Sequence, residues 1–257
     1  MRIIIKIKQH QFLFEELVRR DFTKRYKRTV FGMLWSVISP LVNLLIMWLV
    51  FGKLMGTNVN HYIIYLFSGQ LIFAYFSEAT NLGMTSLLGN AGIFTKVSVP
   101  KYLFLLSQNV SSLINFGVTM IVYFMFVGIE GLPFTWKFFC LIYPVICLVL
   151  FNLGIGMILS TLFVFFRDMQ YLWGIATQLI LWMSATFYTT DMFSDTAKKL
   201  FLLNPLYLII RYFREVVIGG TVPGMAIHLL MMADVLLAMG VGAWMYKRYN
   251  SEFLYYV

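Results

Sequence analysis

Residues Arg19–Pro40 read RRDFTKRYKRTVFGMLWSVISP, and they join a dense basic cluster directly to an apolar segment. The cluster carries six Lys and Arg side chains between residues 19 and 28, whereas the residues from Val30 onward enter hydrocarbon at little cost. Because Lys and Arg are retained on the cytoplasmic side of membrane helices, the junction predicts a cytoplasmic N-terminus. It also sets the direction of every later span.

The composition supports an integral membrane protein. The 257 residues are 60% hydrophobic and 12% charged, with a mean hydropathy of +0.80, whereas soluble domains are about 45–50% apolar and about 25% charged. Nine of the twenty Lys and Arg precede the first span, so the net charge of +9 indicates orientation and contact with anionic lipid. We therefore expect membrane lipid, and no nucleic acid, as a partner.

Apolar windows of about 20 residues predict an all-α transmembrane fold. We expect one transmembrane domain over residues 1–257, with six spans at about 30–51, 62–82, 102–127, 138–165, 171–190 and 225–246. The C-terminal Lys247 and Arg248 fit an arrangement with both termini cytoplasmic, and a seventh span would place them outside.

Residues 1–29 are expected to include a helix that lies along the inner membrane surface. Phe14, Leu17 and Phe22 share one side of that helix. Asp21 and Arg25 also fall there, four residues apart, so we expect them to pair with each other. A solvated basic tail is the alternative interpretation.

Residues 191–221 are predicted to re-enter the membrane from outside as two short helices, about 196–203 and 206–218. The segment is apolar, but Asn204-Pro205 interrupts it, and Arg211, Arg214 and Glu215 fall in the remainder. Irregular backbone at membrane depth is tolerated only inside protein or beside a water-filled path. This segment is therefore a candidate external gate.

Three spans carry small or polar residues at four-residue spacing, which is typical of helix–helix contacts in membranes. They are Ser107, Ser111 and Asn115 in the third span, Asn152, Gly156 and Ser160 in the fourth, and Asp234, Ala238 and Gly242 in the last. The polar face of the third span is expected to hydrogen-bond to a neighbouring helix, and a polar solute path is the alternative. Asp234 and Glu78 are ionisable residues inside predicted spans, so they are either structural or part of a proton or ion relay.

The fifth predicted span has two polar-aromatic sides. One side carries Trp173, Thr177, Ser184 and Tyr188, and a nearly opposite side carries Gln178, Trp182 and Thr189. A helix surrounded by lipid would show a clean apolar side. The span is therefore predicted to have protein or a polar path on both sides.

Sequence motifs for several chemistries are absent. The chain has no G-x-x-x-x-G-K-[ST] phosphate loop, no G-x-S-x-G nucleophile elbow and no His spacing that suits a metal. We expect neither an ATPase site nor catalytic or metal-binding residues, and no sign of internal inverted repeats is evident. Energy for transport would have to come from another chain.

Four segments carry a resemblance to a known family. They are RDFTKRYKRTVFGMLWSVISPL (Arg20–Leu41), VPKYLFLLSQNVSSLINF (Val99–Phe116), FFRDMQYLWGIATQLILW (Phe165–Trp182) and LNPLYLIIRYFREVVIGG (Leu203–Gly220). Together they resemble the membrane subunits of type-2 ABC exporters for polysaccharides, which export O-antigen, capsule, teichoic acids and related lipid-linked glycans.

The resemblance implies a permease of the bacterial cytoplasmic (inner) membrane that forms a homodimer with two copies of a separate ABC ATPase. A lipid-linked glycan would be the substrate, and ATP and Mg would bind only to the ATPase. Residues expected to couple to the ATPase are Arg20, Asp21, Lys24, Arg25, Asn90, Phe94 and Lys96. Residues expected along a channel between the first and fifth spans are Trp35, Trp48, Thr177, Trp182, Ser184 and Tyr188, and those of the external gate are Asn204, Pro205, Arg211, Arg214 and Glu215.

Two other functions remain open from the sequence. A type-2 ABC exporter of small lipophilic molecules would have the same architecture. A membrane-embedded transferase acting on lipid-linked sugars would need convergent acid, base or metal ligands, which the sequence does not display.

Overall fold

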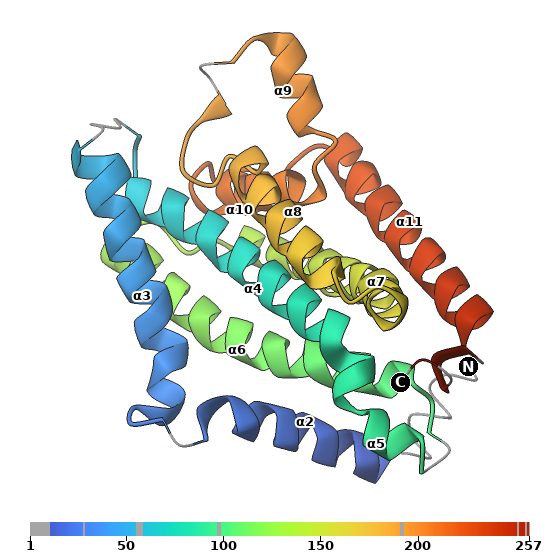
Figure 1. Cartoon of the computed structure of the whole chain (residues 1–257). Coiled ribbons are helices and arrows are strands. Elements are labelled where there is room, and N and C mark those ends of the chain that lie inside the picture. The colour runs from blue at the N-terminus through green and yellow to red at the C-terminus, as the bar shows by residue number, and fades with distance from the viewer. Residues whose placement is uncertain are drawn as a thin grey trace.

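The computed structural model describes residues 11–27, 29–54, 59–96, 99–190, 193–250, 252–254 and 256, and in these residues it contains helices and connecting loops without a strand (Figure 1). The prediction of an all-helical chain is confirmed. The first ten residues of the predicted surface segment and residues 191–192 of the predicted gate lie outside the described part.

The predicted segments correspond to helices with somewhat different bounds. In chain order they are α2 Gln11–Tyr26, η1 Gly32–Leu34, α3 Trp35–Met47, η2 Trp48–Leu54, α4 Tyr62–Gly89, α5 Ala91–Phe94, α6 Tyr102–Ile129, η3 Trp136–Leu141, α7 Ile142–Phe165, α8 Met169–Met183, α9 Asp195–Phe201, α10 Pro205–Val217, α11 Met225–Tyr249 and η5 Glu252–Leu254. The helix of the fifth predicted span ends early, at Met183, and irregular backbone follows it to Thr190. The two short helices predicted around Asn204-Pro205 are present as α9 and α10.

Among the described residues, four helical segments are long and apolar enough to cross a membrane: Gly32–Lys53, Tyr102–Ile129, Trp136–Phe165 and Met225–Tyr249. Of the other two predicted spans, α8 has 15 residues and is about 22 Å long, shorter than the roughly 30 Å of a hydrocarbon core. The helix α4 has 28 residues but is not among the segments apolar enough by hydropathy. The count of six spans and the re-entrant placement of α9 and α10 therefore stay predictions.

The helix α4 is the centre of the bundle. It packs against α3, α6, α7, α8 and α10 (Figure 1), and buried residues occur on every side of it, from Tyr62 to Leu87. Because its neighbours are helices of the same chain, its polar side chains find protein partners, which explains its lower hydropathy. The α2 helix lies across one end of the bundle against α6, with Leu17 buried, whereas α9 and α10 are at the opposite end (Figure 1).

Pro40 is tolerated inside α3 because a neighbouring helix donates the hydrogen bond that the proline cannot donate. Pro40 has no N–H, so the carbonyl of Ser36, four residues earlier, loses its partner in the helix. Thr119 Oγ1 of α6 donates to that carbonyl at 3.3 Å. Gln70 Nε2 of α4 donates to the carbonyl of Pro40 itself at 3.0 Å.

The contact between α7 and α11 depends on the absence of side chains at two glycines. A Cβ at Gly154 would lie 2.6 Å from the carbonyl carbon of Ala238, and a Cβ at Gly242 would lie 2.6 Å from the carbonyl oxygen of Gly154. Both clashes are with backbone, which cannot move aside as a flexible side chain can. The small residues of the last span thus lie at a close contact between helices. Gly156 likewise lies against Gly83 and Leu105, and Ser160 bonds the hydroxyl of Tyr246 at 3.0 Å.

A methyl group at Gly242 should therefore destabilise the protein. We expect Gly242→Ala to lower the free energy of unfolding by about 1–3 kcal/mol, because overpacking forces two backbones apart. Gly240→Ala on the same helix is the matched control, since a Cβ there meets nothing within 4 Å. Thermal unfolding of the purified proteins in detergent measures the difference, and equal melting temperatures would contradict the close-contact interpretation.

Candidate functional sites at the two ends of the bundle

A cavity of about 680 Å³ lies between α2 and the last turns of α4, and we call it the α2 cavity. Five of the seven residues predicted to couple to an ATPase line it: Arg20, Asp21, Lys24, Arg25 and Asn90. Lys96 is exposed after α5, and the side chain of Phe94 lies outside the described part of the structure. The structure thus brings most of this set together from two segments that are some 70 residues apart in sequence.

The carboxylate of Asp21 holds α2 against the bundle. It is 8% exposed, and its two oxygens accept hydrogen bonds from Arg20 Nε at 2.9 Å, Arg20 Nη2 at 2.6 Å and Ser107 Oγ at 3.1 Å. Arg20 Nη2 also donates to Asn90 Oδ1 at 2.7 Å. A buried carboxylate needs such partners, because water no longer solvates it. The network therefore joins α2 to α6 and to the link between α4 and α5.

The predicted pairing of Asp21 with Arg25 is wrong. Asp21 turns inward to Arg20 and Ser107, and Arg25 instead forms an ion pair with Glu78 of α4. Asn115 Nδ2 of α6 donates to the other oxygen of Glu78 at 3.0 Å. Tyr26, which follows Arg25, donates to Asn115 Oδ1 at 2.9 Å. Glu78 is thus held by α2 and α6, and the expected hydrogen bonds from the polar face of the third span are confirmed for Ser107 and Asn115.

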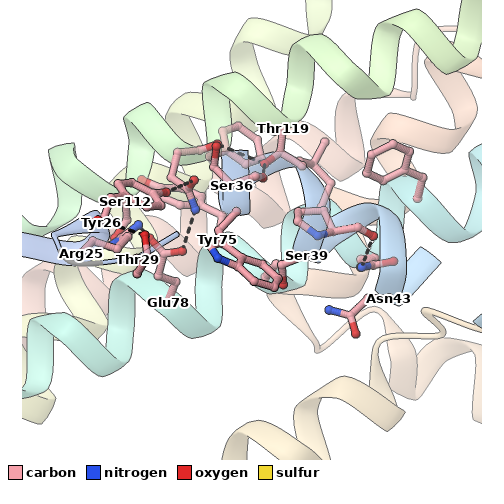
Figure 2. A pocket seen from close by; sticks show the side chains of 18 residues that line it. Arg25, Tyr26, Thr29, Ser36, Ser39, Asn43, Tyr75, Glu78, Ser112 and Thr119 are labelled. Atoms are coloured by element: carbon pink, nitrogen blue, oxygen red, sulfur yellow. Dashed lines mark hydrogen bonds and ion pairs between the residues drawn. The ribbon is translucent and has the colours of Figure 1, made fainter. Parts of the chain in front are cut away.

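A second cavity, of about 330 Å³, continues from Arg25 between α3, α4 and α6, and we call it the α3 cavity (Figure 2). Its lining includes Ser36, Ser39 and Asn43 from α3, Gln70 from α4 and Thr119 from α6. Sequence reasoning missed these residues. Ser36, Ser39 and Asn43 are spaced at i, i+3 and i+7, which places them on one side of α3. This spacing could have identified a polar face on α3 from the sequence. The cavity offers hydroxyl and amide groups within an otherwise apolar segment.

The two sides of α8 have different environments. Trp173 and Thr177 are buried against the bundle, and Trp173 Nε1 donates to Thr80 Oγ1 at 3.2 Å. The opposite side is exposed, with Trp182 48% and Leu179 58% accessible. The helix therefore has protein on one side and an uncovered surface on the other, so the prediction of protein or a polar path on both sides is met on one side only.

The six predicted channel residues differ in their exposure. Trp35 and Trp182 are exposed, and Trp35 also lines the α3 cavity. Thr177 and Ser184 are buried, and their hydroxyls donate to carbonyls of their own helix. Trp48 is partly buried with Lys53 over its ring, and Tyr188 donates to the carbonyl of Trp182. Two aromatic residues of the set thus reach an open surface.

The irregular connection after α8 has side-chain donors for most of its carbonyls. Tyr62 Oη of α4 donates to the carbonyl of Phe187, and Tyr65 Oη donates to that of Tyr188, each at 2.7 Å. Non-helical backbone at membrane depth requires protein partners of this kind. Their positions on α4 show that the bundle itself stabilises the end of α8.

Arg214 of α10 supplies the remaining donors. Its guanidinium donates to the carbonyls of Tyr65 at 3.0 Å, Ala185 at 2.9 Å and Thr186 at 3.0 Å, and it stacks 3.4 Å from the centroid of the Tyr65 ring. A Cβ at Gly69 would lie 2.9 Å from Arg214 Nη2, so the glycine leaves space for the guanidinium. Among the described residues, Arg214 forms no ion pair.

The other predicted gate residues fix the start of α10. Asn204 Oδ1 accepts from the N–H of Leu206 at 3.0 Å, and Pro205 occupies the first turn, which is the preferred chemistry of a helix N-terminus. Asn204 Nδ2 donates to Ser184 Oγ at 3.0 Å and to the carbonyl of Met183 at 3.1 Å. One side chain therefore joins the end of α8 to the start of α10. Arg211 pairs with Glu215 one turn further along α10.

The described residues contain no group of three or more His, Cys, Asp or Glu side chains that could hold a metal ion. Asp234 lies near Cys147 and Phe151 between α7 and α11, and it is 156 residues from Glu78 in sequence. The described residues thus show no chain of carboxylates that would make a proton or ion relay.

Comparison with known proteins gives consistent results. The family model described as ABC-2 type transporter matches residues 13–218. An O-antigen export system permease protein RfbA from Klebsiella pneumoniae is 28% identical over 251 residues, which cover 94% of this chain and 95% of that protein. A protein of the same name from Myxococcus xanthus is 27% identical over 84% of each chain. The polysialic acid transport protein KpsM from Escherichia coli is 23% identical over 93% of this chain and 94% of its own.

The ion pair between Arg25 and Glu78 should contribute more than a surface pair. In a double-mutant cycle of Arg25→Gln and Glu78→Gln, we expect a coupling energy above about 1 kcal/mol, because both side chains are partly buried and share a network with Asn115. The matched control is Asp195 with Lys198 on α9, an exposed pair for which about 0.2–0.5 kcal/mol is expected. Unfolding in detergent provides the energies, and a coupling no larger than the control would contradict the assignment.

Proposed function

Because the chain belongs to the ABC-2 type transporter family, we propose that it is the permease subunit of an ATP-driven exporter that carries a lipid-linked polysaccharide across the bacterial cytoplasmic membrane. The observation that carries this proposal is the nearly full-length similarity to permeases named for O-antigen export and polysialic acid transport. The sequence has no phosphate loop, so the proposed ATPase is a separate chain, present in two copies. ATP and Mg would bind to that partner.

The α2 cavity is the proposed contact for the ATPase. It combines exposed basic residues such as Lys24 with Asn90 beside α5, and both would lie on the cytoplasmic side in the predicted orientation. A push on α5 would pass through Asn90 and Arg20 to Asp21, and from there to α6 through Ser107. The same α2 leads into α3 along the chain. The bonded network thus offers a route from the proposed ATPase to the first span.

The proposed substrate path lies between two copies of the chain. In Figure 1 α3 and α8 flank α4, and both keep exposed apolar surfaces, with Leu45 and Ile46 on α3 and Ile175 and Leu179 on α8 at 48–63% accessibility. Contact with a second copy would cover these surfaces. The lipid tail of the substrate would stay beside the membrane, and the sugars would pass along Trp35, Trp182 and the polar side of α3, where aromatic rings can stack on sugar faces.

Export in cells tests the proposed function. In the organism that carries the gene, depletion of this protein should make a lipid-linked polysaccharide accumulate on the inner face of the membrane while its surface form disappears. Restoring the chain should reverse both changes only when the partner ATPase can hydrolyse ATP. Extraction of lipid-linked glycans and surface labelling measure the two pools. Accumulation of a small lipophilic compound without any change in glycan would favour the alternative exporter.

The same assay tests the coupling assignment. Replacing Phe94 and Lys96 by alanine should abolish export and leave the amount of protein in the membrane unchanged. The matched control is alanine at Phe134 and Lys53, one exposed aromatic and one lysine at the opposite end of the bundle. Normal export with the Phe94 and Lys96 variant would show that this segment does not couple to the ATPase.

Cross-linking tests the proposed homodimer. In a background with Cys140→Ala and Cys147→Ala, the variant Leu45→Cys with Leu179→Cys should form a disulfide-linked dimer on oxidation in membranes. The matched control is Ile146→Cys with Leu237→Cys, which are 53% and 70% accessible but lie on α7 and α11. Equal amounts of disulfide-linked dimer from both variants, or no dimer from the first variant, would contradict an interface formed by α3 and α8.

A further inference from the structure

A third cavity, of about 430 Å³, lies at the end of the bundle opposite α2, and we call it the α9–α10 pocket. The charged residues of its lining are Lys198 and Lys199 from α9 and Arg211, Arg214 and Glu215 from α10. Four cations therefore face one carboxylate. Neither the proposed export path nor the ATPase contact accounts for this excess of positive charge.

Within the described part of the chain, ion pairs do not remove the excess. The one carboxylate among the described lining residues, Glu215, is bonded to Arg211. Arg214 donates to neutral carbonyl oxygens and lies over the neutral ring of Tyr65, and no described carboxylate pairs with it. Lys198 has a partner in Asp195 at 3.5 Å, but that carboxylate is 94% exposed and water screens the pair. The field of the fixed guanidinium and the lysines thus favours an anion in the pocket.

Neutral donors complete the lining. Thr190 Oγ1 and Tyr207 Oη lie 3.4 Å apart on the wall of the pocket, and both hydroxyls can donate to an anionic oxygen. Hydrogen bonds between such donors and an ionised oxygen are stronger than those between neutral groups. The combination of lysines, a paired arginine and two hydroxyls suits the several oxygens of a phosphate group.

Apolar residues around the pocket indicate where such a phosphate would come from. Leu200 and Leu203, next to the two lysines, are 58% and 74% exposed, and Phe193 at the base of α9 is 37% exposed. Basic residues beside exposed apolar residues are typical of a segment at the membrane–water interface. A phosphate carried on a lipid would bring its tail against these side chains while its head enters the pocket.

We propose that the α9–α10 pocket binds a phosphate group carried by a membrane amphiphile. Two sources share this chemistry, the head group of a bilayer phospholipid and the diphosphate that joins a polyisoprenoid lipid to a glycan. Only the use of the site in export rests on the proposed function. Binding itself follows from the charges and the shape of the pocket.

Binding to the purified full-length chain tests the proposal. Two probes distinguish the sources: geranylgeranyl diphosphate added to protein in neutral maltoside micelles, and phosphatidylglycerol at increasing fractions in phosphatidylcholine nanodiscs. We expect saturable binding of at least one probe, weakened by salt. Lys198→Gln with Lys199→Gln should reduce the affinity about tenfold or more. Binding of geranylgeranyl diphosphate alone would identify the lipid carrier of a glycan as the source of the phosphate. Binding of phosphatidylglycerol alone would identify a bilayer lipid.

Two further variants separate the site from a general effect of charge. Lys198→Arg with Lys199→Arg keeps both charges and should retain the affinity of the parent. Lys53→Gln with Lys247→Gln removes the same two charges elsewhere and should also retain it. Absence of binding by the parent in both arms, or equal affinities for the two glutamine double variants, would overturn the proposal. Because no arm measures transport, these outcomes do not depend on whether the chain exports a glycan.

Discussion

The guanidinium of Arg214 makes the broken end of α8 possible. After Met183 the chain leaves the helix, and in a membrane each free carbonyl there costs several kcal/mol unless protein supplies a donor. Arg214 donates to the carbonyls of Ala185 and Thr186 from α10, and it also holds the carbonyl of Tyr65 on α4. Three segments that are distant in sequence therefore meet at one cation. The absence of a side chain at Gly69 is a condition for this arrangement.

A buried charged group also anchors the α2 end of the bundle, but there the charge is negative. Asp21 is a buried anion between Arg20 and Ser107, so charge and hydrogen bonds there are balanced inside the network. The balanced network holds α2 to α6, whereas α3 packs mainly against α4 and α6 and leaves Val42, Leu45 and Ile46 at 48–54% exposure. Of the four described segments long and apolar enough to cross a membrane, the one that contains α3 has the smallest buried share. Under the proposed function, α3 lines the substrate path, so a wall of that path is a helix that the rest of the fold covers only partly.

Much of the fold follows from local sequence patterns, and most of the tertiary pairing does not. Apolar length and the Asn204-Pro205 break predict the helices and the two short segments, because these depend on neighbouring residues. The partner of Arg25 is 53 residues away at Glu78, and that of Arg214 is 149 residues away at Tyr65. Spacing along one helix carries no information about such pairs. For Asp21 and Arg25 the spacing indicated a pair with each other, whereas each has other partners. The early end of α8 was missed for the same reason, since donors from α4 and α10 make it possible.

A single helix, α4, extends between the two anchored ends. α4 has 28 residues and is therefore about 42 Å long, and it carries Glu78 in the lining of the α3 cavity and Tyr65 beside Arg214. A helix packed on all sides moves along its axis as a unit, because its hydrogen bonds resist stretching. A displacement of Arg25 with α2 would thus be felt at the carbonyl of Tyr65 without a chain of side-chain rearrangements. Since Arg214 also lines the α9–α10 pocket, movement of α4 would change how strongly that pocket holds an anion.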